Sequence, residues 1–520
     1  MTISTLGDMV RDHAQARPLA RAMAFEGRIT TYGELDRRTN QVAQALRAAG
    51  LAPGDRIAHL GKNSDLYFEL LLGAAKAGVV TAPINWRLAP PEIAHVLADS
   101  TAKLLFVGPE FIDLARSPAL DFPWAATIGM ESPLPGGDFA SWRDGQSHED
   151  LGVQVTPDDA VVQLYTSGTT GLPKGVVLSH DNFLALQRAQ SGPDYAWNRW
   201  GDDDVALAAM PGFHVGGVGW PLTAFYNGAL AVVVREFDPL AVLDFIETWR
   251  ISKLLLVPAA MQLVVRQPNA LTVDFSRLKY IFYGASPIPL DLLRESMAVF
   301  GSGFVQLYGM TETAGAVVAL GPEDHDPAGN ARMRSAGRPL PGVEIQVWGD
   351  DGRALPAGEV GEIVIRSASN MLGYFGQLQA TADTLVAGGW LRTGDAGYLD
   401  ADGYVFIHDR VKDMIISGGE NIYPAEVENA VFGHPDVAEV AAIGVPSDRW
   451  GEEVKAIVVL RPGVEPDPEA LIAWARGRIA GYKTPKSVDF MDVLPRNASG
   501  KILRRELRAS YWKAREGPLV

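Results

Sequence analysis

Segments rich in apolar and β-branched residues alternate with amphipathic helical patterns through the first 340 residues, and this alternation limits the fold more than any other feature. Buried strands are predicted at 56–60, 79–84, 103–107, 161–165, 205–210, 229–234, 253–257 and 280–283. Helical patterns separate several of these strands, at 31–49, 65–77 and 239–250. Because parallel strands are joined through crossover helices, the pattern predicts an α/β fold of layered subdomains with parallel sheets.

The pattern changes after about residue 339, where short strands at 343–348, 361–365 and 404–408 are separated by turns that contain Asp and Gly. We expect a small β-rich subdomain at about 339–410, which completes a large N-terminal domain of residues 1–410. The remaining residues, 411–520, combine helical patterns at 424–432 and 468–480 with strands at 437–445 and 454–461. They are predicted to form a small α+β C-terminal domain, of a size that can fold on its own.

The composition disfavours several classes of function. The 520 residues include no cysteine, which excludes disulfides, thiolate catalysis and cysteine-ligated zinc. A formal net charge of −16 argues against nucleic acid as the main partner, because phosphate backbones bind to basic surfaces. No apolar run reaches the roughly 18 residues of a spanning helix, and the first residues lack a signal pattern. We therefore expect a cytoplasmic enzyme without a transmembrane segment.

One stretch of ten residues combines glycines, hydroxyl side chains and a lysine: Thr166, Ser167, Gly168, Thr169, Thr170, Gly171, Leu172, Pro173, Lys174 and Gly175. Glycines allow a tight turn whose N–H groups approach an anion, and the hydroxyls and the lysine add donors and positive charge. The stretch therefore suits a polyphosphate. It is not a Walker A loop, because Gly175 follows the lysine where Ser or Thr would stand. A flexible surface linker is the competing interpretation, which the apolar runs on both sides disfavour.

Four further stretches follow in order: Tyr308 to Glu312, Thr393 to Asp395, Asp409 to Pro424, and Pro495 to Lys501. Together with the first, they resemble the adenylate-forming superfamily, which contains acyl-CoA synthetases, the adenylation domains of peptide synthetases and beetle luciferases. The resemblance covers nearly the whole chain. It implies an AMP-forming enzyme that uses ATP and Mg²⁺ to convert a carboxylic acid into an acyl-adenylate. The acyl group is then transferred to a thiol, here that of coenzyme A.

The resemblance also implies roles at the nucleotide. The loop 166–174 is expected to hold the β- and γ-phosphates, Thr311 the α-phosphate and Glu312 the Mg²⁺. Around the nucleoside we expect Tyr308 on adenine, Asp395 and Arg410 at the ribose, and Gly284, Ala285, Ser286, Gly309 and Met310 close by. Lys501 would be the catalytic cation. Taken alone, Glu312 could be a helix cap, Asp395 a turn residue and Lys501 a solvated lysine.

In members that form CoA thioesters the small domain rotates after adenylation, so the resemblance implies a mobile C-terminal domain and places its hinge at Lys412. Gly418 and Gly419 are expected to line a tunnel for the pantetheine arm, because a side chain there would block it. Contacts to CoA are expected from Trp450, Tyr482, Lys483 and Lys486. A tryptophan is more often part of a core, and lysines are usually solvated, so these four have a plain structural alternative.

The acid is expected next to Phe213 and His214, where amino-acid-activating relatives tend to place an aspartate for the substrate ammonium. Without that carboxylate a buried ammonium would have no partner, which favours fatty or bulkier ring acids. The predicted acyl pocket consists of Phe213, Val215, Gly216, Val218, Ala314 and Gly315. Val218 stands where one long-chain type carries a gating tryptophan. His214 is assigned to catalysis, but it could also be a structural histidine or a mobile gate.

Three functions compete at this point. The first is an AMP-forming acid:CoA ligase acting on a medium- or long-chain fatty acid, or on a bulkier aryl or alicyclic acid. The second is a stand-alone adenylation enzyme that loads an acyl group onto a carrier protein. The third is a non-catalytic scaffold, which the complete set of charged motif residues disfavours. The sequence also allows a homodimer.

Overall fold

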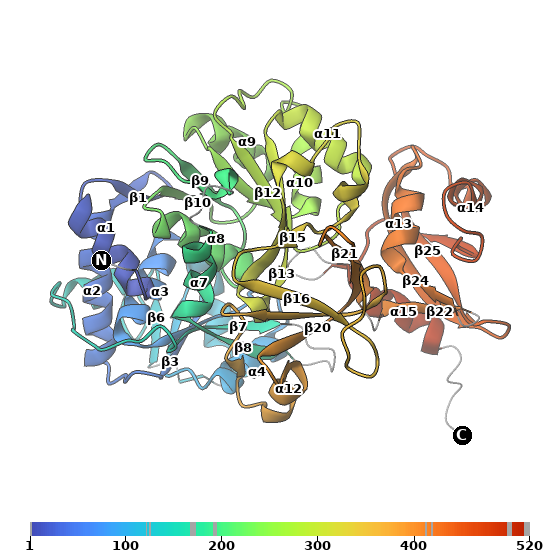
Figure 1. Ribbon diagram of the computed structural model, residues 1–520. Helices are drawn as coiled ribbons and strands as arrows, with labels where there is room; N and C mark the ends of the chain where they lie inside the picture. Colours follow the sequence, from blue (N-terminus) through green and yellow to red (C-terminus); the bar gives the residue numbers. More distant parts are fainter. Residues whose placement is uncertain are drawn as a thin grey trace.

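The computed structural model describes residues 3–120, 122–123, 126–166, 173–190, 195–410, 413–417, 420–496 and 502–513. Figure 1 shows a large α/β N-terminal domain with a smaller C-terminal domain, drawn in orange and red, at its side. This arrangement confirms the predicted fold class. Within the described ranges, none of the helices combines the length and apolarity needed to span a bilayer.

The first large sheet has nine strands. Their spatial order is β15 (Arg338–Pro339), β14 (Gly315–Leu320), β13 (Gly303–Met310), β12 (Tyr280–Gly284), β11 (Lys253–Leu256), β9 (Val205–Ala208), β10 (Leu230–Val233), β1 (Arg21–Phe25) and β2 (Arg28–Thr31). Neighbours from β13 to β1 pair in parallel, whereas the pairs β13–β14, β14–β15 and β1–β2 are antiparallel. The predicted parallel centre is therefore present, with antiparallel edges.

The second large sheet has seven strands. Their order is β18 (Gly373–Tyr374), β8 (Lys174–Ser179), β7 (Ala160–Thr166), β4 (Val80–Pro83), β3 (Arg56–Leu60), β5 (Leu104–Val107) and β6 (Thr127–Gly129). The strands from β7 to β6 pair in parallel, and β7–β8 and β8–β18 are antiparallel. The stretch 167–172 therefore connects two neighbouring antiparallel strands of one sheet.

Helices cover the faces of these sheets (Figure 1). They are α1 (Leu6–Ala16), α2 (Tyr32–Ala48), α3 (Asp65–Ala77), α4 (Pro90–Ser100), α5 (Ile112–Arg116), α6 (Phe139–Asp144), α7 (His180–Ala189), α8 (Val215–Tyr226), α9 (Pro239–Thr248), α10 (Pro258–Val265) and α11 (Leu290–Phe300). Helix α2 begins where the sequence predicts it, because the Thr31 hydroxyl accepts a hydrogen bond from the backbone N–H of Glu34 and caps the first turn.

A third sheet of five strands closes the large domain. It consists of β16 (Val343–Trp348), β17 (Gly361–Ser367), β20 (Trp390–Leu399), β19 (Leu385–Val386) and β21 (Val405–Arg410), with α12 (Leu378–Thr384) beside it. One buried cluster joins all three sheets, since Leu164 of β7, Ala206 of β9 and Ile363 of β17 belong to it. The β-rich part therefore packs into the core of the large domain.

The C-terminal domain has a sheet and a buried cluster of its own. Its strands are β23 (Glu420–Ile422), β22 (Ile415–Ser417), β25 (Gly451–Leu460), β24 (Val437–Ser447) and β26 (Ser487–Phe490), and its helices are α13 (Pro424–Phe432), α14 (Pro468–Arg476) and α15 (Arg504–Lys513). Val431, Val440 and Ala456 lie in its core. Helix α14 is shorter than predicted, because Gly477 follows its last residue as C-cap.

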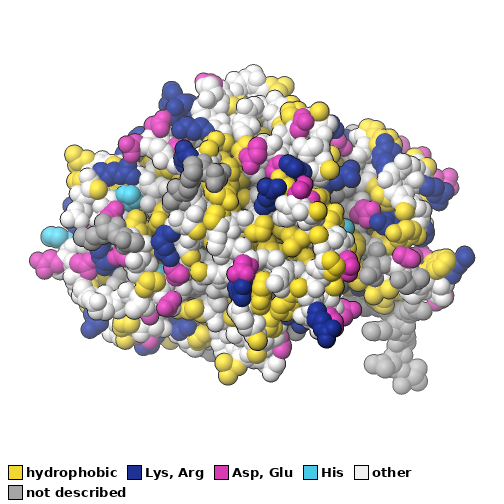
Figure 2. Space-filling view, in the orientation of Figure 1, with side chains coloured by type: hydrophobic (Ala, Val, Ile, Leu, Met, Phe, Trp, Pro, Cys, Tyr) yellow, Lys and Arg dark blue, Asp and Glu magenta, His cyan; other side chains and the backbone are white. Residues whose placement is uncertain are grey.

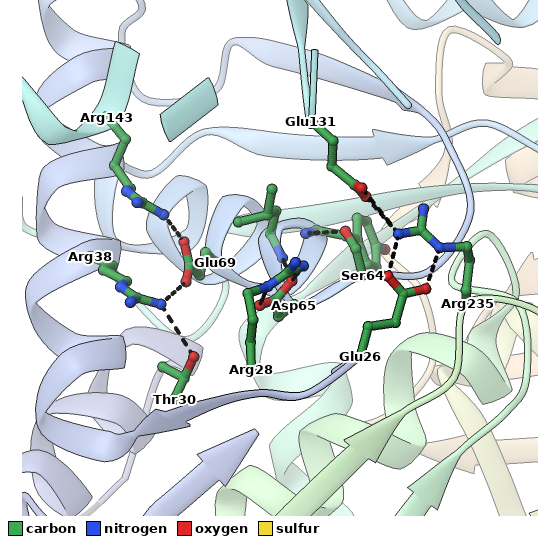
Figure 3. A network of polar contacts seen from close by, with 12 residues as sticks. Glu26, Arg28, Thr30, Arg38, Ser64, Asp65, Glu69, Glu131, Arg143 and Arg235 are labelled. Atoms are coloured by element: carbon green, nitrogen blue, oxygen red, sulfur yellow. Dashed lines mark hydrogen bonds and ion pairs between the residues drawn. The ribbon is translucent and has the colours of Figure 1, made fainter. Parts of the chain in front are cut away.

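A network of ion pairs lies around the hairpin of β1 and β2 and links it to the body of the large domain (Figure 3). The buried Glu69 carboxylate of α3 pairs with Arg38 at 2.9 Å and with Arg143. Nearby, the guanidinium of Arg235 bonds to Glu26 at 2.7 Å and to Glu131 at 3.0 Å. The two cations offset part of the cost of removing this carboxylate from water, and burial still raises the pKa of Glu69. On the face shown in Figure 2, acidic and basic side chains are interspersed, and hydrophobic side chains gather near the centre.

Candidate active site

Several predicted site residues follow parallel strands of the nine-stranded sheet directly, at the carboxyl ends of those strands. The chain passes from β9 to its neighbour β10 on one side and from β11 to β12 on the other, so the order of the strands changes direction between β9 and β11. Such a switch point opens a crevice in α/β sheets. Residues 211–214 follow β9, Ala285 and Ser286 follow β12, and Thr311 and Glu312 follow β13.

Tyr308 and Asp395 come into direct contact at this edge. The Tyr308 hydroxyl of β13 donates a hydrogen bond of 2.7 Å to Oδ2 of Asp395, a buried carboxylate in β20. The backbone N–H of Asp395 is bonded to the Thr393 hydroxyl at 3.0 Å. Arg410 of β21 is the register partner of Asp395, and its side chain lies outside the described part of the structure. Two motifs that are 87 residues apart in sequence thus share one polar contact.

Glu312 and Lys174 both lie close to Tyr374. The Tyr374 hydroxyl donates to Oε1 of the buried Glu312 at 2.9 Å, and the Lys174 ammonium lies 5.0 Å from the centre of the Tyr374 ring. Tyr374 reaches this place because β18 pairs with β8, the strand that begins at Lys174. The ring therefore links the lysine that closes the glycine-rich stretch to the carboxylate that follows β13.

Close backbone approaches shape the floor of the site. A Cβ on Gly309 would lie 1.9 Å from the carbonyl oxygen of Gly315, so only glycine fits there. Ala285 has a φ of 66°, in the left-handed region that costs a residue with a side chain free energy. Such strain is concentrated at functional sites in proteins. Met310 is held next to this floor, since its backbone N–H is bonded to the Thr313 hydroxyl at 3.0 Å.

Several predicted site residues lie outside the described ranges. They are Ser167, Gly168, Thr169, Thr170 and Gly171 of the glycine-rich stretch, the hinge residue Lys412, the tunnel residues Gly418 and Gly419, and Lys501. At two of these gaps, the described residues on either side pair with each other. Thr166 and Lys174 are register partners across β7 and β8. Before and after Lys501, Arg496 and Ile502 form an antiparallel bridge.

A cavity of about 220 Å³ opens beside this edge of the sheet. Its lining comprises Asn182, Phe183, Leu184, Leu186, Gln187, Gln190, Trp197, Asn198, Met210, His214, Val215, Gly216, Gly219, Trp220, Leu222, Thr223, Leu255, Leu256, Val257, Phe282, Gly284, Ala285, Leu307, Gly309, Thr313, Ala314, Gly315, Ala316 and Leu340. Four of the six predicted acyl-pocket residues, Val215, Gly216, Ala314 and Gly315, are among them.

The structure places the other two, Phe213 and Val218, away from this lining. Val218 is fully buried in the core of the large domain, since it lies about 160° around α8 from Gly216 and about 100° from Gly219. Phe213 packs against Trp86, with ring centres 6.0 Å apart. Trp220 does line the cavity, and its indole N–H donates to the Leu207 carbonyl oxygen at 3.1 Å.

His214 is held at the cavity by the loop before α8. Asn63 accepts from the Gly212 N–H at 2.7 Å, and the Tyr67 hydroxyl donates to the Gly212 carbonyl oxygen at 2.8 Å. Burial lowers the pKa of His214 to about 4, and the positive charge of Arg87 adds to this effect. The imidazole is therefore neutral near pH 7. Its buried Nε2 has no hydrogen-bond partner among the described residues.

Sequence reasoning missed much of the cavity wall. The face of α7 that carries Gln187, the segment with Trp197 and Asn198, and Phe282 of β12 all contribute. Gln187 and Phe282 are more than 25 residues from the nearest predicted acyl-pocket residue, and Trp197 and Asn198 lie on another element. No regular spacing along the chain links these residues to the predicted ones. The one available signal was the period of α8, which puts Gly216, Gly219 and Thr223 on one helical face.

On the C-terminal domain, three of the four residues predicted to contact CoA are exposed, and Lys483 is half-buried. Trp450 and Tyr482 are 42% and 46% exposed, which does not fit the alternative of core packing. Ser417, the last described residue before the predicted tunnel glycines, pairs with Gly451 next to Trp450. Lys483 pairs with Glu426 at 2.7 Å, and the Lys486 ammonium donates to the Gly481 carbonyl oxygen at 3.0 Å.

Comparisons with known proteins find family models and relatives that match most of the chain. The model of the AMP-binding enzyme family matches residues 10–375, and that of the AMP-binding enzyme C-terminal domain matches residues 426–501. The chain is 46% identical to a fatty acid–[acyl-carrier-protein] ligase of Streptomyces coeruleorubidus, over 98% of this chain and 97% of the relative. It is 41% identical to a feruloyl-CoA synthase of Amycolatopsis, over 97% and 99%.

A solved structure shows the same fold. The ATP-bound MatB of Rhodopseudomonas palustris superposes with a TM-score of 0.87 at 31% identity, covering 98% of this chain and 99% of that one.

Proposed function

Because this chain belongs to the AMP-binding enzyme family and to its acid:CoA ligases, we propose that its site activates a carboxylic acid with ATP in the cavity beside α8. One observation carries the proposal. The Tyr308–Asp395 contact and the Lys174–Tyr374–Glu312 arrangement gather groups from distant segments at one sheet edge, next to that cavity. A nucleotide and an acid would meet there.

The nucleotide would occupy the edge of the sheet. The Asp395 carboxylate can accept hydrogen bonds from both ribose hydroxyls, with Arg410 assisting, and the Tyr308 ring would stack on adenine. Gly284, Ala285, Ser286, Gly309 and Met310 leave room for the base and sugar. The glycine-rich stretch up to Lys174 would bind the β- and γ-phosphates, and Thr311 would bond the α-phosphate.

Glu312 fits a magnesium ion. Its carboxylate is buried, an oxygen is oriented by the Tyr374 hydroxyl, and carboxylate oxygens are the ligands that Mg²⁺ prefers next to phosphates. When bound, the metal would neutralise charge on the leaving diphosphate. Within the described residues no group of three His, Asp or Glu side chains forms a separate metal centre.

The reaction joins two anions, so positive charge must be supplied where they meet. An oxygen of the substrate carboxylate attacks the α-phosphorus, the bond to the β-phosphate oxygen breaks, and diphosphate leaves. Since His214 is neutral near pH 7, it would orient the carboxylate through a hydrogen bond without adding charge. The cation would be Lys501, brought in by the C-terminal domain.

We propose a boundary between residues 410 and 411, with Lys412 as the hinge about which the C-terminal domain turns. After the turn, the thiol sulfur would attack the acyl carbonyl carbon, and AMP would leave. Gly418 and Gly419 would form the tunnel wall, with Trp450, Tyr482, Lys483 and Lys486 around its entrance.

A carrier protein is the alternative acceptor, because the chain is 46% identical to an acyl-carrier-protein ligase. The cytoplasmic location and the homodimer stay predictions.

Two measurements test the proposal. The first is exchange of labelled diphosphate into ATP with Mg²⁺ and a panel of carboxylic acids, and no exchange with any acid would refute the function. The second uses Lys501→Ala, which should abolish adenylate formation but keep thioester formation from a supplied acyl-adenylate. Arg505→Ala, which removes a nearby exposed cation, is the matched control. Equal loss of both half-reactions would contradict the role of Lys501.

A further inference from the structure

The cavity beside α8 runs from the carboxyl ends of the parallel strands toward their beginnings. Helix α8 connects β9 to the parallel strand β10, so it passes back along the sheet in the opposite direction to both. Its lining residues extend from Val215 to Thr223, which is about 12 Å along the helix axis at 1.5 Å per residue. The cavity therefore has one end at His214 and a far end near Thr223.

Lys253, the first residue of β11, stands on the side of the sheet that faces this far end. Alternate residues of a strand share a face, and Leu255, two residues after Lys253, lines the cavity. On β12, Phe282 lines the cavity, and Tyr280, the register partner of Lys253, precedes it by two residues. At about 3.3 Å per residue, Lys253 and Tyr280 lie about 7 Å beyond the lining residues, toward the beginnings of the strands.

The segment 195–200 closes the far end, and the Lys253 ammonium holds this segment. Trp197 lines the cavity. The Nζ of Lys253 donates hydrogen bonds to the carbonyl oxygens of Trp197 at 3.0 Å and of Arg199 at 2.6 Å. It also lies 4.2 Å from the centre of the Trp200 ring, where a cation is attracted to the ring face. One side chain of the sheet thus fixes two peptide groups and one ring.

Trp200 extends this hold to the aromatic wall of the cavity. Its ring centre lies 5.7 Å from that of Trp220, which lines the cavity. The Trp220 indole N–H is bonded to the Leu207 carbonyl oxygen, whereas Nε1 of Trp200 is buried without a hydrogen-bond partner in the described part of the chain. The position of the Trp200 ring therefore depends on the ammonium and on packing.

A lysine at this place is costly for the fold. Lys253 is 0% exposed, and burying a cation costs free energy that an apolar side chain of the same length would avoid. Burial lowers the pKa of Lys253 to about 8, and the Asp204 carboxylate opposes this shift, so the amine keeps its charge near pH 7. What the lysine adds over a methionine is its hold on the segment 195–200.

We propose that Lys253 is a positioning residue that fixes the closed end of the cavity and so sets the longest acid that the site accepts. It acts through the backbone of Trp197 and Arg199 and the ring of Trp200, not through contact with the acid. The inference rests on the proposed function, because the limit exists only if the cavity holds the acid. Without the ammonium, the segment would move outward and a longer acid would fit.

The limit is measured with straight-chain carboxylic acids and with arylpropenoic acids that carry a para-alkyl chain of increasing length. The limit ratio is kcat/KM for the first acid that the wild type uses about tenfold less well than its best one, divided by kcat/KM for the shortest acid used. Lys253→Met cannot donate, so it should raise this ratio about tenfold or more, since one methylene counts for about 10–200-fold. The change should lie in KM for the acid, with KM for ATP constant.

Lys76→Met is the matched control. Lys76 of α3 is 2% exposed, burial lowers its pKa to about 8 as well, and its Nζ bonds to Oδ1 of Asn40 in α2 at 2.7 Å. Lys76→Met should lower the melting temperature and leave the limit ratio unchanged. The comparison separates the loss of any buried lysine from the loss of the hold on the segment 195–200.

The wild type allows a second measurement that needs no variant. Above about pH 8 the Lys253 amine loses its charge, and uncharged hydrogen bonds are roughly half as strong, so the limit ratio should rise several-fold between pH 7 and 9. The groups that face the amine are Asp204, its partner Lys279 at 2.6 Å, and Tyr280, whose ring centre lies 5.7 Å from Nζ. In Lys253→Met the ratio should not change with pH.

A limit ratio that is equal in the wild type and in Lys253→Met overturns the inference, as does an equal fall in kcat/KM for every acid. If Lys253→Met does not fold, a flat wild-type ratio between pH 7 and 9 overturns it instead. These results would leave the proposed function standing, whereas no diphosphate exchange with any acid would remove both.

Discussion

Gly219 offers the sharpest test that the cavity beside α8 holds the acid. A Cβ on Gly219 meets no heavy atom within 4 Å, and the residue lies inside a helix, so a side chain there can enter the cavity without displacing protein. Gly219→Ala should raise the free energy of unfolding by up to about 1 kcal/mol, because alanine is the better helix former. Gly219→Leu should fold equally well and fill part of the roughly 220 Å³ of the cavity.

The expected effect is a shortened substrate range. Each methylene-sized group that no longer fits should cost about 1–3 kcal/mol, or about 10–200-fold in kcat/KM. We expect Gly219→Leu to lose that factor for the largest acid the wild type accepts and to keep activity with the shortest. AMP release with a homologous series of acids, with CoA present, measures this. A loss of the same size for every acid would refute the assignment of the cavity.

Gly217 provides the contrast on the same helix. A Cβ at this position would lie 1.9 Å from the carbonyl oxygen of Pro211, in the loop that carries His214. Gly217→Ala should therefore lower the melting temperature and reduce activity with all acids alike. If Gly217→Ala and Gly219→Ala had the same effect, the orientation of α8 described here would be wrong.

Three further outcomes are expected. Tyr374→Phe removes the hydroxyl 2.9 Å from the Glu312 carboxylate, a bond to a charged group worth about 1.5–3 kcal/mol, so the half-maximal Mg²⁺ concentration should rise about tenfold or more. Diphosphate exchange and the Mg²⁺-dependent melting shift with ATP both report it, and an unchanged Mg²⁺ titration would count against Tyr374. Tyr308→Phe keeps the ring but loses the hydrogen bond to Asp395, so KM for ATP should rise several-fold while KM for the acid stays constant. A rise in KM for the acid alone would contradict the placement of the nucleotide. Burial lowers the pKa of His180 and of His214 to about 4 from an ordinary value near 6.5. Below pH 6.5 the unfolded chain therefore binds protons that the folded protein does not. The free energy of unfolding falls as the pH drops from 6.5 to 4. The full effect, reached below pH 4, is about 3 kcal/mol for each histidine. Urea unfolding at pH 7.5 and 5 should show roughly 2 kcal/mol of it for each, and a flat profile would contradict buried neutral histidines.

Much of the architecture could be read from local patterns. The α2 and α3 patterns and the strands 56–60 and 343–348 are found within a residue of their predicted bounds. Helix periodicity, capping residues such as Thr31 and apolar runs act over a few neighbouring residues, so they are visible in any sequence. The motif residues Tyr308, Glu312 and Asp395 could be selected for the same reason, since each lies in a short characteristic stretch.

The alternating α/β layers, the separate C-terminal domain and the motifs predicted to bind ATP could be found from the sequence, because they follow from local spacing and residue chemistry. Which side chains become neighbours depends on how distant segments of the chain pack together. This packing puts Tyr374 close to both Lys174 and Glu312, turns Val218 into the core while Gly219 faces the cavity, and brings Gln187 to Thr223. These neighbours are set by sheet register and helix packing between segments distant in sequence, which no pattern along the chain encodes.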